Sequence, residues 1–400
     1  MSGAYHGKKT STRYWWTKMT ERNIPWAVDQ VATPAFVVEE NLLRHNLEIL
    51  KQVKEATGCK ILLAQKAFSM YYFYPLMAQY LDGTTASGSY EAQLGHEHFP
   101  GEVHVYSPAF RDEEMSEILP IADHIVFNSF TQWHRFKHLK NQTKASFGLR
   151  VNPNVSTQDG HEIYDPCAPG SRLGILVTDF EGQDLTGIDG LHFHTLCEQD
   201  SDDLETTLEA IEAHFGDLLY QMKWLNFGGG HHITRPGYDI ERLIRLINHM
   251  QTRYDLTVYL EPGEAVALNA GYLVASVLDI THNQGVTNAI LDTSATCHMP
   301  DVLEMPYRPH IIRSGQPDEK AYTYQLGGPT CLAGDIIGTY SFDQPLAIGD
   351  KLIFCDMAIY SMVKTNTFNG MPLAKIMAAD SQNNLSIVNQ FDYNEFKRRL

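Results

Sequence analysis

Short apolar runs alternate with amphipathic stretches along residues 33–269. In the amphipathic stretches, apolar residues recur about every three to four positions, which is the spacing of one helix face. Strands that alternate with helices pair in parallel through right-handed crossovers, and eight such units are typical of a (β/α)8 barrel. The eight runs that we expect to be barrel strands are KILLAQ (60–65), TTAS (84–87), VHVYS (103–107), HIVFN (124–128), SFGLRV (146–151), GLHFHT (190–195), KWLNF (223–227) and TVYLE (257–261).

A doubly wound open sheet is the alternative to a barrel. A dinucleotide-binding sheet of that kind carries a glycine-rich fingerprint directly after its first strand. The segment KILLAQKAFSM (60–70) contains no glycine, and we therefore favour the barrel.

The pattern changes after residue 269, where helical periodicity nearly vanishes. Residues 270–400 contain strand-like runs separated by Gly, Pro, Asn and Asp, which predicts an all-β domain. The run TPAFVV (33–38) is a further strand candidate for this sheet, reached from the other end of the chain. Residues 1–32 are polar with scattered aromatic residues, and we expect them to form an N-terminal extension.

Composition narrows the classes of partner. The 400 residues include 31 Lys and Arg against 48 Asp and Glu, a formal charge of −17. Nucleic acids and anionic membranes attract basic surfaces, so neither is an expected partner. The six cysteines include no C-x-x-C pair, which argues against a zinc ribbon, and we predict no metal site. We find no secretory signal or membrane-spanning segment, and we expect a cytoplasmic protein with free thiols.

Candidate chemistry gathers at the ends of the predicted barrel strands, where barrel enzymes place their active sites. Lys66 follows an apolar run, so it is either a partly buried nucleophile or a lysine whose amine reaches back to water. Glu261 ends another apolar strand, and a carboxylate there needs a cationic partner. His194 shares a strand face with His192, and it is either a ring-stacking residue or a hydrogen-bonded core histidine.

Three consecutive glycines, Gly228, Gly229 and Gly230, end the seventh strand. Such a turn can present backbone N–H groups to an anion, although glycine-rich turns are also common without a ligand. An amine nucleophile, an anion cradle, a carboxylate and an imidazole together match the requirements of pyridoxal 5'-phosphate. We therefore predict this cofactor.

Seven motifs occur along the chain in the order of one known family. Between about Thr33 and Phe391 the chain resembles the pyridoxal-phosphate decarboxylases of the alanine-racemase-like fold (fold type III), which include ornithine, arginine and diaminopimelate decarboxylases. ILLAQKAFSM and HTLCE are similar to the carboxynorspermidine (carboxyspermidine) branch in particular. The motifs are ILLAQKAFSM, ASGSYEAQLG, GLHFHTLCE, LNFGGGHHI, EPGEA, GPTCLAGD and DMAIYSMVKTNTFNG.

The resemblance implies a barrel over residues 33–269 and a role for each matching residue. Lys66 would attach the cofactor, His194 would stack on its ring, and Glu261 would pair with the ring nitrogen. Gly228, Gly229 and Gly230 would hold the phosphate with Tyr360, and Arg150 would lie near the phenolic side of the ring. Cys331 would be the candidate acid that protonates the α-carbon, with a water molecule as the alternative donor.

The resemblance further implies a homodimer that completes each active site with Cys331 and Asp335 of the other subunit. Relatives that act on ornithine or diaminopimelate generally read E-P-G-R where this chain has Glu264 in place of the arginine. We expect Glu264 to contact a substrate amine, together with Asp301 and Asp335. The implied reaction is decarboxylation of carboxynorspermidine or carboxyspermidine in polyamine synthesis.

Two alternatives remain open. One is another basic amino-acid decarboxylase of the diaminopimelate or ornithine/arginine type. Leu332 and the missing arginine count against the diaminopimelate type, whose substrate has a polar distal end. The other is a non-catalytic pyridoxal-phosphate-binding protein, which the β-rich region 270–400 disfavours.

Overall fold

A computed structural model describes residues 22–158 and 162–400. The chain divides into two compact units. One unit comprises residues 44–266, and the other combines the described residues up to Leu43 with residues 267–400. The divisions fall inside helices α2 (Glu40–Thr57) and α9 (Glu264–Ala267).

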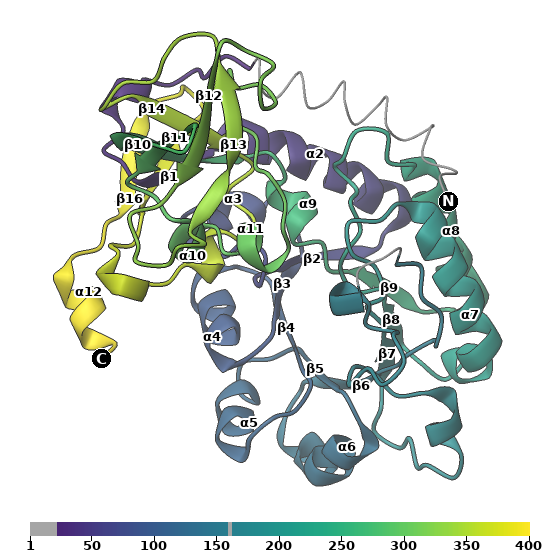
Figure 1. The fold of residues 1–400 in the computed structure, drawn as a ribbon. Helices are drawn as coiled ribbons and strands as arrows, with labels where there is room; N and C mark the ends of the chain where they lie inside the picture. Colours follow the sequence, from purple (N-terminus) through teal and green to yellow (C-terminus); the bar gives the residue numbers. More distant parts are fainter. Residues whose placement is uncertain (1–21, 159–161) are drawn as a thin grey trace. The chain divides into compact units, whose positions relative to one another are not determined.

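The first unit is a closed barrel of eight parallel strands, seen in cross-section in Figure 1. Each strand pairs with its neighbour in chain order, and β2 closes the ring against β9. All eight predicted strands are confirmed. They are β2 (Lys60–Ala64), β3 (Gly83–Ala86), β4 (Glu102–Ser107), β5 (His124–Phe127), β6 (Ser146–Arg150), β7 (Gly190–His192), β8 (Trp224–Asn226) and β9 (Thr257–Leu260).

Helices surround this ring in Figure 1, and α8 shows why the sequence places them there. Its buried residues Leu243, Ile247, Met250 and Tyr254 follow the three-to-four spacing of one helix face. The Asp239 side chain caps its first turn by accepting a hydrogen bond from the Arg242 N–H. Helix α8 spans Ile240–Tyr254. Further helices of this unit are α3 (Tyr74–Met77), α4 (Ser89–His98), α5 (Asp112–Ile118), α6 (Phe130–Phe136) and α7 (Ser201–Leu219).

The connection from β6 to β7 is irregular. Its described part contains the 3₁₀ turns η4 (Glu162–Tyr164) and η5 (Val177–Phe180). Short 3₁₀ turns also occur elsewhere in the chain: η1 (Val28–Gln30), η2 (Tyr71–Phe73), η3 (Lys137–Gln142), η6 (Met362–Lys364) and η7 (Phe368–Gly370).

The amino end of the barrel contains the Trp224 side chain, whose indole N–H donates to the Ser146 hydroxyl over 2.8 Å. Glycines on the two preceding strands leave room for this ring. A Cβ atom at Gly148 would lie 2.3 Å from the Trp224 ring, and one at Gly190 would lie 2.1 Å from it. These contacts explain why β6 and β7 carry glycine.

The second unit is an all-β sheet, as predicted. Its strand order is β13-β12-β11-β10-β1-β15-β16, and β14 pairs with β10. The strands are β1 (Ala35–Glu39), β10 (Gly271–Asn283), β11 (Val286–Leu291), β12 (Tyr322–Gly327), β13 (Ile336–Phe342), β14 (Lys351–Cys355), β15 (Lys375–Ala379) and β16 (Leu385–Asn389). Its helices are α10 (Ala295–His298), α11 (Asp301–Glu304) and α12 (Tyr393–Arg398).

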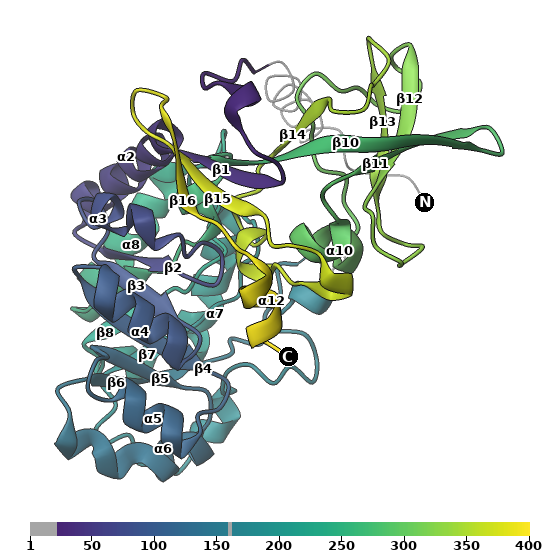
Figure 2. The same cartoon turned by 90° about the vertical axis from the view of Figure 1, so that its left-hand side faces the viewer.

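Strand β1 joins this sheet from the N-terminal part of the chain. It pairs antiparallel with β10 and parallel with β15, and Figure 2 shows it among these strands. The barrel unit therefore begins at residue 44, later than the expected boundary at 33. Strand β15 has a weak strand signal in the sequence because KIMAA is short and alanine-rich, and alanine is uncommon in strands. Most of the predicted N-terminal extension, residues 1–21, lies outside the described residues.

Candidate active site

Lys66 lies in the turn directly after β2. Buried Gln65 holds this turn, because its side chain donates to the Glu91 carbonyl (2.8 Å) and accepts from the Tyr74 hydroxyl (2.9 Å). The Lys66 amine lies 3.1 Å from His194 Nε2. The side chain is accessible to solvent, yet the surrounding protein lowers the pKa of Lys66 by burial, helped by the positive charge of Arg150. Such an amine has a larger unprotonated, nucleophilic fraction.

His194 follows β7 and is fixed by its own backbone. Arg150, at the end of β6, donates from Nη2 to the His194 carbonyl over 3.0 Å. The guanidinium of Arg150 lies 4.7 Å from the centre of the Tyr106 ring. Burial and the charges of Lys66 and Arg150 lower the pKa of His194 well below its usual value, so the imidazole is neutral. Its buried Nδ1 has no hydrogen-bond partner among the described residues.

Glu261 follows β9 and is held in its ionised form. One carboxylate oxygen lies 3.1 Å from His192 Nε2, and the other accepts from the Asn226 amide over 2.8 Å. Burial alone would raise the pKa of Glu261, but the interactions with His192, His104 and Asn226 outweigh burial and lower it to about 2. Burial lowers the pKa of His192, so we assign a neutral imidazole that donates its Nε2 hydrogen to the carboxylate.

The glycines after β8 form a cradle that no other residue fits. Gly228 and Gly230 have φ values of 68° and 83°, which favour glycine. A Cβ atom would lie 2.3 Å from the Phe193 carbonyl oxygen at Gly228, and 1.9 Å from the Leu196 carbonyl oxygen at Gly230. In the described chain, the backbone N–H groups of Gly229 and Gly230 donate no hydrogen bond to protein. They are therefore available to an anion.

Glu264 begins α9, is half-buried and lies near Cys197. Burial raises the pKa of the Cys197 thiol to about 12, and the charges of Glu198 and Glu264 add to this effect. The Cys197 thiol is therefore protonated.

The structure thus brings the predicted barrel residues together around Lys66: His194, Arg150, Glu261 and the three glycines.

The remaining predicted residues lie in the β unit, and two of them already have protein partners. The Asp301 carboxylate pairs with Lys364 Nζ at 2.5 Å. Asp335 is only 2% exposed, and it accepts hydrogen bonds from the hydroxyls of Ser294 (2.8 Å) and Thr330 (2.7 Å). We expected both acids to face a substrate, whereas in this unit their carboxylates serve internal contacts.

Cys331 and Tyr360 have different surroundings. Cys331 is exposed, and its backbone N–H donates to the Asn369 side chain over 2.6 Å. Tyr360 is half-buried with a φ of 55°, and the Lys364 amine lies 5.5 Å from the centre of its ring.

Sequence reasoning missed several residues that support the site. Asn226 is the last residue of β8 and stands two positions before Gly228, and this spacing was the available signal. Tyr106 stacks on His192 with ring centres 5.4 Å apart and donates to Asn128 over 2.8 Å. Glu91 lies in the motif ASGSYEAQLG, and it accepts from the Ser87 N–H over 2.6 Å.

A second ionisable cluster lies at the amino end of the barrel. Ligand atoms of Glu102, His104 and His124 lie within 4.8 Å of one another. Both carboxylate oxygens of Glu102 are already used, one by Lys60 and the other by His104 Nε2 (2.9 Å) and the Tyr259 hydroxyl (3.2 Å). Lys60 therefore supplies the positive charge that a metal ion would otherwise provide.

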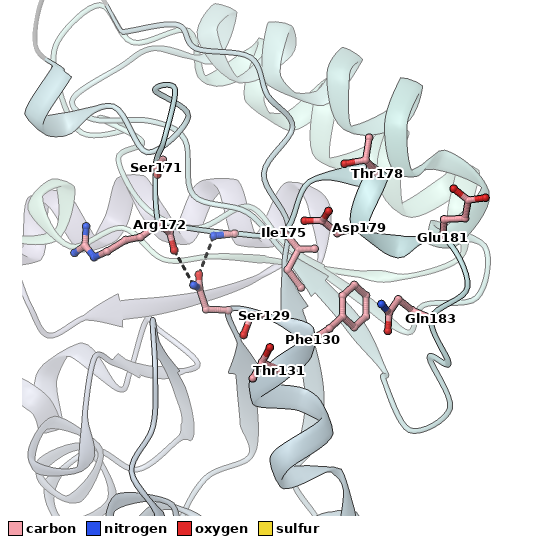
Figure 3. Close-up of a pocket in the computed structure, with 12 residues that line it drawn as sticks. Ser129, Phe130, Thr131, Ser171, Arg172, Ile175, Thr178, Asp179, Glu181 and Gln183 are labelled. Carbon is pink, nitrogen blue, oxygen red and sulfur yellow. Dashed lines mark hydrogen bonds between the residues drawn. The ribbon is translucent and has the colours of Figure 1, made fainter.

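A cavity of about 680 Å³ opens between α6 and the β6–β7 connection (Figure 3). Asn128 lines it and binds the Arg172 carbonyl and the Gly174 N–H, both over 2.8 Å. Its described lining includes none of the predicted site residues.

The sequence of residues 36–358 matches the family described as "Pyridoxal-dependent decarboxylase, C-terminal sheet domain". The chain belongs to the pyridoxal-dependent decarboxylase family. Among its curated relatives, the carboxynorspermidine/carboxyspermidine decarboxylase of Campylobacter jejuni is 45% identical, covering 93% of this chain and 99% of the relative. The carboxyaminopropylagmatine decarboxylase of Synechocystis is 42% identical, covering 93% and 96%.

A solved structure supports the same family membership. The C. jejuni carboxynorspermidine decarboxylase, crystallised in complex with norspermidine, aligns with a TM-score of 0.87 and 44% identity. The alignment covers 92% of this chain and 100% of that one. Within the described residues of this family member, no helix is both long and apolar enough to cross a membrane.

The site fits the cofactor that gives the family its name. The glycine cradle offers free N–H donors to a phosphate. Glu261 is an ionised carboxylate suited to a protonated ring nitrogen, and Lys66 is an amine of lowered pKa suited to an aldehyde. The unpartnered Nδ1 of His194 belongs to a neutral ring that can lie against an aromatic face.

Proposed function

We propose that this protein decarboxylates carboxynorspermidine or carboxyspermidine, with pyridoxal phosphate as cofactor, to give norspermidine or spermidine. The observation that carries the proposal is the placement of the Lys66 amine beside neutral His194, with Glu261 ionised and held apart from it by His192 and Asn226. The relatives with these activities, at 39–45% identity, support the choice of substrate.

Each barrel residue has a defined task in this proposal. Lys66 would hold the cofactor through its amine. Glu261 keeps the ring nitrogen protonated, and His194 fixes the plane of the ring. When bound, the cofactor accepts the electron pair left by the departing carboxylate. The glycine cradle fixes the cofactor's phosphate, and Arg150 maintains the position of His194.

Proton delivery is assigned to Cys331 of a second copy of this chain. Its thiol is exposed within its own unit, and the apolar side chains of Leu332 and Phe368 beside it are each 43% exposed. Exposed apolar residues around an active-site loop favour an interface between subunits. We therefore propose a homodimer with shared active sites. Tyr360 stays a proposed ligand of the phosphate.

Glu264 is the proposed carboxylate for the distal amine of the substrate. Asp301 is already neutralised by Lys364, and Asp335 is buried with its oxygens occupied. We therefore assign Asp335 to holding the loop of Cys331, and we assign Asp301 a weaker contribution to substrate binding. The six free cysteines agree with a cytoplasmic location, which is part of the proposal.

The test compares carbon dioxide release from carboxynorspermidine, carboxyspermidine, carboxyaminopropylagmatine, diaminopimelate and ornithine. We expect kcat/KM to be highest for one of the first two substrates. The third is included because the Synechocystis relative is nearly as similar as the C. jejuni enzyme. A guanidinium end accepted better than an amine would overturn the substrate choice, and so would preference for diaminopimelate or ornithine.

Glu264→Gln tests the amine contact, with Asp301→Asn as the matched variant. Removing one charge-assisted contact is worth roughly 1.5–3 kcal/mol, so we expect KM to rise about tenfold or more in Glu264→Gln. The Asp301→Asn change should raise KM less, because Lys364 already pairs with that carboxylate. Equal effects of the two changes would contradict the assignment.

A further inference from the structure

The loop that carries Cys331 lies between β12 and β13 and contributes little to the core. Four consecutive residues, from Cys331 to Gly334, are exposed, so apolar burial does not fix their conformation. The loop is anchored at its far end by Asp335, whose carboxylate binds Ser294 and Thr330. At Cys331 itself, the anchor is the hydrogen bond from its backbone N–H to Asn369 Oδ1, 2.6 Å long.

Asn369 is well suited to this contact. It lies in η7 with a φ of 58°, a left-handed conformation that asparagine tolerates better than most residues. This conformation and the side-chain oxygen are required at one position, and only a few residue types provide both.

The contact closes a ring of hydrogen bonds. From η7, the Phe368 N–H donates to Asn366 Oδ1 (2.9 Å), and Asn366 Nδ2 donates to the Thr296 carbonyl (2.8 Å). The Thr296 N–H then donates to Asp335 Oδ1 over 3.3 Å, which returns to the loop of Cys331. The loop is thus held between two segments more than 30 residues away on either side.

We propose that Asn369 is the positioning residue that sets where the Cys331 thiol delivers its proton. The inference rests on the proposed function, in which a bond between the α-carbon and the carboxylate breaks and carbon dioxide leaves. The proton of the thiol then forms the new carbon–hydrogen bond with the electron pair left behind, and solvent restores the thiol. Displacing a reacting group by about 1 Å can cost up to about a hundredfold in rate.

The experiment follows the reaction in D2O and measures both kcat and the stereochemistry of the deuterium placed on the α-carbon. A positioned thiol places deuterium on one face. In Asn369→Gly, which tolerates the φ value but lacks the side-chain oxygen, we expect kcat to fall about tenfold, KM to stay constant and deuterium to appear on both faces. Asn369→Asp keeps both the acceptor and the conformation, and we expect it to restore a single face.

Asn366→Ala is the matched control, because it breaks the same ring without touching Cys331. We expect it to lower the melting temperature as Asn369→Gly does, while deuterium stays on one face. If Asn366→Ala also scrambles the label, or if Asn369→Gly keeps a single face, the positioning role of Asn369 is wrong.

Cys331→Ala separates this inference from the proposed function. Full rate and a single deuterated face in Cys331→Ala would remove Cys331 as the proton donor, and the proposal for Asn369 would fall with it. A slow, scrambled Cys331→Ala beside a normal Asn369→Gly would leave the proposed function standing and overturn only the inference.

Discussion

The barrel holds a lysine, a glutamate and a histidine near each of its two ends. At the amino end, Lys60, Glu102 and His104 bind one another directly, with Glu102 at the centre. At the carboxyl end, Glu261 is bound by His192 and Asn226, whereas the Lys66 amine faces His194.

The pairing, rather than the residue types, separates a structural cluster from a reactive site. A lysine that pairs with a carboxylate stays a protonated ammonium. Burial alone would lower the pKa of Lys60, but the contact with Glu102 outweighs burial and raises it. Lys66 forms no ion pair with a carboxylate within residues 22–158 and 162–400, and burial with the charge of Arg150 lowers its pKa. The carboxyl end thus keeps an amine and a carboxylate from neutralising each other, because the partners of Glu261 are a neutral imidazole and an amide. The negative charge of Glu261 therefore remains available to a cationic ligand.

The largest effect is expected for Lys66→Ala. Losing the nucleophile should lower kcat by roughly a thousandfold or more and remove the visible absorption of the protein-bound cofactor. The matched variant is Lys60→Met, which removes the half-buried lysine at the amino end of the barrel and should keep kcat per folded molecule within about threefold. Retained absorption in Lys66→Ala would contradict the role of this lysine.

Glu261→Gln should have the next largest effect on activity. The change removes the negative charge opposite the ring nitrogen, and loss of one such electrostatic contact costs roughly a hundredfold in kcat. Absorption spectra and equilibrium dialysis of the cofactor, measured beside kcat, check the cause. An unchanged spectrum with unchanged kcat would mean that Glu261 does not contact the ring.

Glu102→Gln, at the amino end of the barrel, should have the opposite effect to the changes at the carboxyl end: stability should change and activity should not. Removing one partner of a partly buried ion pair leaves Lys60 without its carboxylate and should lower the free energy of unfolding by about 2–3 kcal/mol. Urea denaturation measures the loss of stability, and kcat per folded molecule measures whether activity is unchanged. A large fall in kcat without loss of stability would show that the amino end takes part in the chemistry.

The same cluster predicts how stability depends on pH. Burial pushes the pKa of Glu102 up, but hydrogen bonds from His104 and Lys60 outweigh it and lower the pKa to about 2. A lowered pKa stabilises the fold above the usual carboxyl value of 4.5, and this contribution disappears as the pH falls from about 4.5 towards 2. Glu102→Gln should therefore lose less stability than the wild type across that interval, in urea titrations at successive pH values.

The smallest effect is expected for Tyr106→Phe, which lies on β4 two residues after His104. The change removes the hydrogen bond to Asn128 but keeps the ring that stacks on His192, so we expect a loss of about 1 kcal/mol of stability. Activity should change by less than about threefold. A larger fall in kcat would mean that the Asn128 contact positions His192.

Much of the barrel site was predictable because parallel strands end at a common rim. Lys66, His194, Glu261 and the glycines each follow an apolar run, so their sequence positions imply their meeting. The partners of Asp301 and Asp335 were not predictable in this way. Lys364 lies 63 residues from Asp301 and Ser294 lies 41 residues from Asp335, and no periodicity links such distant loops.

The pairing of β1 with β15 has a consequence for synthesis of the chain. In this pairing Ala35 lies opposite Lys375, so the paired residues are 340 positions apart in the sequence. Ribosomes add roughly 5–20 residues per second, so β1 leaves the ribosome roughly 20–70 s before its parallel neighbour exists. During this interval all eight barrel strands and β10, the antiparallel neighbour of β1, emerge. One edge of β1 therefore stays open until β15 is made, and stalling translation between residues 283 and 375 should leave residues 35–39 more sensitive to protease than in the full chain.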